Sequence, residues 1–99
     1  MMDELSEDLL LEIQEMASLF FSPETIAQVI GMEKDRFVEL LSDASHPAAQ
    51  AFNKGSIMSE VELRRSVIKL AKQGSSPAQT LSMKLRDELV TQLINLRIK

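Results

Sequence analysis

Three basic residues, Arg65, Lys69 and Lys72, have the most informative spacing in this 99-residue chain. They stand at i, i+4 and i+7, so on a helix they share one face. Like charges at this spacing repel by roughly a few tenths of a kcal/mol each unless something negative faces them. Three interpretations follow: a solvated face, a surface for DNA phosphates, or a surface for acidic helices of a neighbouring subunit. A solvated face would lie opposite the apolar residues Val61, Leu63, Val67, Ile68 and Leu70.

Residue types that usually carry catalysis or bind metals are scarce. The chain has no Cys and a single His, and His46 precedes Pro47 in a linker without a second His or Cys to complete a metal site. Gly31, Gly55 and Gly74 are too far apart to cradle a phosphate. We therefore interpret His46 as a turn residue and expect no catalytic residue, no metal and no cofactor. The sequence indicates a protein that is not an enzyme.

The hydrophobic pattern indicates one small domain without a membrane segment. Apolar residues make up 44% of the chain, enough for a thin core, but no uninterrupted apolar run exceeds three residues. A membrane span needs about 20 apolar residues and a signal peptide about 7 to 15. We expect neither, and we expect a cytoplasmic protein with no membrane partner.

Helical periodicity and punctuation predict an all-α fold. The expected helices cover about residues 6–20, 23–30, 33–41, 47–73 and 77–97. Ser22 and Ser76 are expected N-caps, the latter in a capping box with Gln79, while Gly31 and Gly74 should close helices in the left-handed conformation. The periodicity assigns Phe20 and Phe37 to the core. Gly55 is a possible kink or break in the long helix.

Residues 23–42 match the packing pattern of a helix-turn-helix. Ala27 is the small residue where the two helices cross, Gly31 makes the turn, and Phe37 supplies the core of the second helix, supported by Ile26, Ile30, Met32 and Leu40. The pattern resembles DNA-binding helix-turn-helix units. A plain helical hairpin is the alternative, and Glu33, Asp35 and Glu39 make the second helix a weak reader of bases on its own.

The formal charge of −4 hides a division of the chain. Residues 1–45 carry 11 acids and two bases, a charge of −9, whereas residues 46–99 carry nine bases and four acids, a charge of +5. Such asymmetry points to a polyanion partner or to contact between unlike halves. We therefore expect an acidic region at 1–45, with the helix-turn-helix at 23–42, and a basic helical hairpin at 46–99.

The last expected helix is more apolar than a small fold can cover. Its apolar residues are Leu81, Leu85, Leu89, Val90, Leu93, Ile94, Leu96 and Ile98. A chain of this size has few other elements to bury them. We expect the long helix and the last helix to form an antiparallel hairpin that drives self-association.

Beyond the helix-turn-helix, three stretches are distinctive. They are Ala-Phe-Asn-Lys-Gly at residues 51–55, Glu-Val-Glu-Leu-Arg-Arg at 60–65, and Leu-Ala-Lys-Gln-Gly-Ser-Ser-Pro-Ala-Gln at 70–79. With them the chain, over roughly residues 22–82, resembles the phage small terminase subunits of the short, homeodomain-like type.

This resemblance implies a non-enzymatic packaging protein. Small terminase subunits form rings through their later helices, bind double-stranded viral DNA, and deliver it to a large ATPase-nuclease subunit, in the host cytoplasm. In this sequence Ala27, Gly31 and Phe37 would hold the helix-turn-helix. The implied DNA contacts are Lys34, Arg36, Lys54, Arg64, Arg65, Lys69 and Lys72. Two alternatives stay open: a dimeric helix-turn-helix transcription regulator, and a protein–protein interaction module that binds no DNA.

Overall fold

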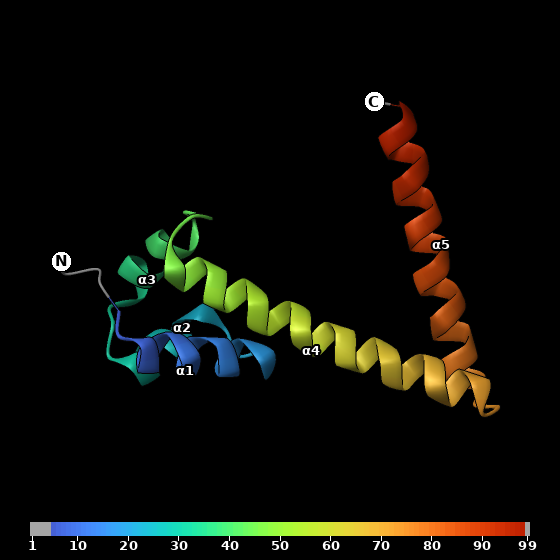
Figure 1. The fold of residues 1–99 in the computed structure, drawn as a ribbon, viewed down its shortest axis with the longest axis horizontal. Coiled ribbons are helices and arrows are strands. Elements are labelled where there is room, and N and C mark those ends of the chain that lie inside the picture. Colours follow the sequence, from blue (N-terminus) through green and yellow to red (C-terminus); the bar gives the residue numbers. More distant parts are fainter. Residues whose placement is uncertain (1–4, 99) are drawn as a thin grey trace. The chain divides into compact units, whose positions relative to one another are not determined.

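The computed structural model describes residues 5–98 and is all-helical over that range, as predicted (Figure 1). The elements are α1 (Glu7–Ser18), α2 (Pro23–Ile30), α3 (Lys34–Leu41), α4 (Pro47–Lys72) and α5 (Ser76–Ile98). Each end lies within two residues of the range predicted from the sequence. Proline at the first position of α2 and α4 helps to set these starts, because its missing N–H has no partner there in any helix.

The ends of α2 are fixed by local hydrogen bonds. Ser22 is the N-cap, and its hydroxyl accepts from the Thr25 N–H at 3.3 Å. Gly31 closes the helix with φ of 76°, and the Met32 N–H donates to the Ala27 carbonyl at 2.9 Å. A residue with a Cβ is strained at such a φ, which explains the glycine. The connection to α3 is therefore short and rigid.

The start of α5 differs from the prediction. The N-cap is Ser75, whose hydroxyl accepts from the Ala78 N–H at 3.3 Å, and Ser76 is already helical. Gln79 donates its side-chain amide to the Ala71 carbonyl at 3.0 Å rather than reaching back to a cap. The predicted Ser76–Gln79 capping box is wrong, because two adjacent serines offer alternative caps and Gln79 finds an acceptor at the end of α4.

The chain divides into two compact units, one ending at Val61 and the other beginning at Glu62. We call them the N-terminal unit and the C-terminal unit. The division lies inside α4, so the first turns of that helix belong to the N-terminal unit. The division predicted between residues 45 and 46 rests on the change of net charge along the chain, and it stays a prediction.

The core of the N-terminal unit joins α1, α2, α3 and the start of α4. Its buried side chains are Ile13, Ile26, Ala27, Phe37, Leu40 and Ala48. Phe37 is fully buried, as predicted, and α2 packs against both α1 and α3. Small Ala side chains at the helix contacts let the backbones approach closely, so the core is compact with one fully buried ring, Phe37, and the half-buried ring of Phe52 packed against it.

Gly55 does not break α4, which is continuous through it. It is buried and faces the backbone of α1, where a methyl group in place of its hydrogen would overlap the Gln14 carbonyl. The Gln14 side-chain amide also contacts the Met58 sulfur at 3.9 Å. Gly55 is therefore the point of closest approach between α1 and α4.

Phe20 is not a core residue, contrary to the prediction. It follows the end of α1 with φ of 65°, and its N–H donates to the Ala17 carbonyl, while that of Phe21 donates to the Met16 carbonyl. This is the helix-closing geometry that normally takes glycine. The chain leaves the helix at this point, so helical periodicity no longer places the ring, and Phe20 is 60% exposed.

Candidate nucleic-acid interface

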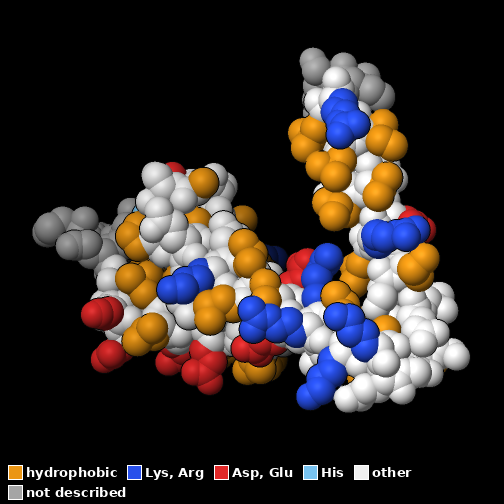
Figure 2. Space-filling model, turned by 45° about the vertical axis from the view of Figure 1, so that its right-hand side comes forward, with side chains coloured by type: hydrophobic (Ala, Val, Ile, Leu, Met, Phe, Trp, Pro, Cys, Tyr) orange, Lys and Arg blue, Asp and Glu red, His pale blue; other side chains and the backbone are white. Residues whose placement is uncertain are grey.

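Arg65, Lys69 and Lys72 come together on the C-terminal half of α4. With Ile68 and Gln73 they line one shallow surface depression, which we call the basic groove. All five residues are exposed, and Figure 2 shows Lys and Arg side chains gathered over this part of α4. The sequence predicted the three bases but assigned Ile68 to the opposite face. At i+3 from Arg65 it lies beside the bases and gives the groove an apolar floor.

The three bases of the basic groove carry uncompensated charge. Within residues 5–98, no ion pair involves any of them. The C-terminal unit as a whole has eight bases and three acids, a formal charge of +5. Three cations along about two helical turns match the spacing of an extended polyanion better than that of a single small ligand.

Arg64 lies beside a second depression. This one is lined by Arg64 and Ile68 of α4 and by residues of α5 that include Leu85, Leu89 and Gln92. Arg64 is therefore close to the basic groove along the chain but points to another side of α4. The α5 part of this lining is mixed, with the charged Arg86 and Glu88 beside the two leucines.

The other three predicted bases belong to the N-terminal unit. Lys34 is exposed at the start of α3 and lies 3.9 Å from the Glu24 carboxylate, while Arg36 pairs with Glu39 on the same helix. Lys54 is exposed on α4. Exposed pairs of this kind contribute about 0–1 kcal/mol to stability, so a polyanion can displace the acids at little cost.

His46 has a structural role, as predicted. Its Nδ1 accepts from the Ala48 N–H at 3.0 Å and so caps the first turn of α4. Nearby, the Asp43 carboxylate accepts from the Ser45 hydroxyl at 2.6 Å and from the Ser45 N–H at 3.0 Å, which holds the pKa of Asp43 below its ordinary value. Among the described residues, no three His, Cys, Asp or Glu side chains are placed to hold a metal ion.

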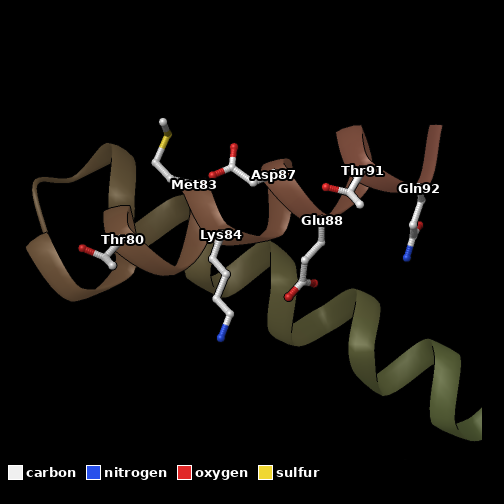
Figure 3. Close-up of a pocket in the computed structure, with 7 residues that line it drawn as sticks. All are labelled: Thr80, Met83, Lys84, Asp87, Glu88, Thr91 and Gln92. Atoms are coloured by element: carbon white, nitrogen blue, oxygen red, sulfur yellow. The ribbon is translucent and has the colours of Figure 1, made fainter. Parts of the chain in front are cut away.

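A third shallow depression lies along α5. Thr80, Met83, Lys84, Asp87, Glu88, Thr91 and Gln92 line it. All seven come from one helix, and their side chains diverge, with Lys84 and Asp87 pointing to different sides (Figure 3). The arrangement presents polar groups to a surface contact instead of converging on a small molecule. Nothing in the sequence pattern predicted this depression.

No helix within residues 5–98 combines the length and the apolar character that crossing a membrane requires. Comparisons with models of known families, with curated proteins and with solved structures found no match.

Proposed function

We propose that this chain is a non-enzymatic DNA-binding protein that acts as an assembly of identical copies, like the small terminase subunit that recognises viral DNA for packaging. The basic groove carries the proposal. It presents Arg65, Lys69 and Lys72 together, exposed and without an acidic partner among the described residues. Contacts to phosphates supply most of the sequence-independent affinity of DNA-binding proteins.

The pair of helices α2 and α3 is the proposed second contact. Two eight-residue helices joined at a left-handed Gly31 have the dimensions of a helix-turn-helix. Lys34 and Val38 are exposed on α3. The Glu33 side chain caps the start of that helix by accepting from the Arg36 N–H at 3.1 Å. Acids on α3 leave it few groups for reading guanine, so it positions the protein more than it selects a sequence.

The apolar surface of α5 favours more than two copies. Leu85, Leu89 and Leu96 lie along one side of the helix, and Met83, Val90 and Ile94 lie about 140° around it at 3.6 residues per turn. Figure 2 shows hydrophobic side chains exposed along α5. A two-fold dimer covers one side of such a helix. Two neighbouring copies cover both sides of α5, which favours a ring. A large terminase subunit is the further partner in this proposal.

The salt dependence of duplex binding tests the proposal. Combined substitution of Arg65, Lys69 and Lys72 by Ala should reduce the slope of log affinity against log salt by about 2.7, since each phosphate contact contributes about 0.9. The matched control removes three bases from α5 of the same unit, through Lys84→Ala, Arg86→Ala and Arg97→Ala. The control should retain most of the slope.

Two results would overturn the proposal in different ways. Absence of duplex binding at low salt would leave a protein–protein interaction module. A two-fold assembly with strong preference for one operator over random duplex would instead identify a transcription regulator. A larger assembly with a steep slope and a weak sequence preference is the result that we expect.

A further inference from the structure

An exposed apolar surface on α1 has no counterpart in the function proposed above. Leu11, Leu19 and Phe20 are each about 60% exposed, at 59, 61 and 60%. Leu11 lies on α1, Leu19 is its C-cap residue eight positions later and about 80° around at 3.6 residues per turn, and Phe20 follows directly. We call these three residues the α1 patch. It lies in the N-terminal unit, away from the buried face of Ile13 and Ala17.

Phe20 makes this surface unusual. It has a bulky side chain at a positive φ, where glycine is the usual residue and an aromatic one is strained. Its ring is also largely exposed, so the side chain gains little from the fold, and the backbone gains the hydrogen bond to Ala17 at the cost of the strained φ. Strain of this kind at an exposed position points to a contact made outside the unit.

Acidic residues run along the α1 patch, and Glu15 stands between Leu11 and Leu19, four residues from each. Asp8, Glu12 and Glu15 stand at i, i+4 and i+7 on the same side of α1 as Leu11, and all three are exposed. Within residues 5–98 none of them has an ion-pair partner. The N-terminal unit has 12 acids and three bases, a formal charge of −9. The surface that fits the α1 patch therefore carries bases beside an apolar side chain.

The basic groove of α4 has this complementary character. Its bases repeat the i, i+4, i+7 spacing of the three acids, and Ile68 lies between them with 44% of its surface exposed. Two helices that carry opposite charges at the same spacing can pair them along their length while the apolar residues meet. Such charge complementarity fixes the register and the partner of a contact.

We propose that the α1 patch of one copy docks on the basic groove of α4 in a second copy. The contact joins unlike surfaces, so it is head-to-tail and can repeat around a ring. This contact rests on the proposed function only in requiring that copies assemble. Its basic side is formed by the same three bases that we assign to DNA phosphates. DNA and the α1 patch therefore compete for the groove.

Cross-linking tests this contact directly, because the chain contains no cysteine. One chain receives Ser18→Cys, three residues from Glu15 at the edge of the α1 patch, and a differently tagged chain receives Gln73→Cys in the groove. The two are mixed without DNA and treated with a short bismaleimide. The control replaces the first chain by one with Val38→Cys on α3, which is exposed but lies outside the patch.

We expect severalfold more mixed dimer from the Ser18→Cys pair than from the control pair. Adding Glu12→Lys and Glu15→Lys to the first chain should lower the yield about tenfold, and Arg65→Glu with Lys69→Glu in the second chain should restore it, as expected for close charge pairs. Added duplex should also lower the yield. Phe20→Gly should lower the yield without unfolding the N-terminal unit.

Each contrary result has a distinct meaning. Equal yields from the Ser18→Cys pair and the control pair, in a sample that native mass spectrometry shows to be assembled, would overturn the contact and leave the proposed function standing. Failure of charge reversal to rescue would overturn the pairing of α1 with the groove. If the chain without cysteine substitutions bound no duplex while the Ser18→Cys pair still cross-linked, the proposed function alone would be overturned.

Discussion

The two units of this protein differ in how much of their apolar surface they bury. Of the buried apolar side chains in residues 5–98, all but Ala78 lie in the N-terminal unit. Along α5 the large apolar side chains are exposed, with Leu89 at 53% and Leu96 at 67%. An isolated helix gains too little from its own hydrogen bonds to be stable without packing. The N-terminal unit is thus stabilised by its own core, and in the function that we propose other copies of the chain complete the C-terminal unit.

The charges differ in the same direction. The N-terminal unit, which contains the core, is acidic, at −9, and the C-terminal unit is basic, at +5. The core that stabilises the fold lies in the N-terminal unit and the basic groove in the C-terminal unit, so substitutions in one unit should leave the stability of the other largely unaffected. The four predictions below test this separation.

The largest effect is expected from Gly55→Ala in the N-terminal unit. The new methyl group overlaps the Gln14 carbonyl, so α1 must move away from α4, at a cost of about 3 kcal/mol or more. For a domain of this size the melting temperature should fall by roughly 10–20 °C. Circular dichroism measures the melt, and the Phe37 ring resonances report on the core.

Ser56→Ala is the matched control, since it adds no volume next to the same contact. An unchanged melting temperature for Gly55→Ala would contradict the close packing of α1 on α4.

A second expected effect lies in the C-terminal unit. Leu89→Lys combined with Leu96→Lys places charge on an exposed apolar side of α5 and should weaken self-association at least tenfold, about 1.4 kcal/mol. The melting of the N-terminal unit should stay within about 0.5 kcal/mol, as for other surface changes. Analytical ultracentrifugation and thermal melts measure the two effects.

The control for these lysines is Lys84→Ala with Thr91→Ala, on a polar side of α5. If the lysine variant unfolded the N-terminal unit, the two halves would not be separate.

Phe20→Gly should stabilise the N-terminal unit slightly. Glycine removes the left-handed strain, worth about 1–2 kcal/mol, but adds about 0.5–1 kcal/mol of chain entropy to the unfolded state. The net gain is about 1 kcal/mol or less, seen as a small rise in melting temperature. A clear fall would indicate that the ring packs inside its own unit.

The smallest effect concerns Asp43 and pH. Hydrogen bonds from Ser45 lower its pKa below the ordinary value of 3.8. The ionised carboxylate is therefore favoured in the folded state, so its contribution is present above pH 3.8 and disappears as the pH falls through the folded-state pKa. NMR titration of the Asp43 carboxyl group measures this, and Ser45→Ala should move the pKa back up. Titration at or above 3.8 in the unsubstituted chain would contradict it.

Much of the fold was predictable because its signals are local. Ser22, Gly31 and Gly74 mark helix ends through their own hydrogen bonds and dihedral angles, and Phe37 lies on the buried side of a regular helix. Phe20 was misassigned since periodicity stops at the helix end, where its φ is positive.

Features that depend on distant parts of the chain were not predictable. The space that a methyl group on residue 55 would need is occupied by α1, more than 40 residues earlier in the sequence. Local helix propensity does not include this contact, so it suggested a kink at Gly55 instead. The three bases of the basic groove were found from spacing alone. The position of Ile68 among them was missed, because an apolar residue was assumed to belong to the opposite face.

Native mass spectrometry at low micromolar concentration tests most directly whether other copies complete the C-terminal unit. We expect assemblies of more than two chains that take up duplex DNA. A monomer at every micromolar concentration would contradict self-association through α5 and, with it, the proposed packaging role.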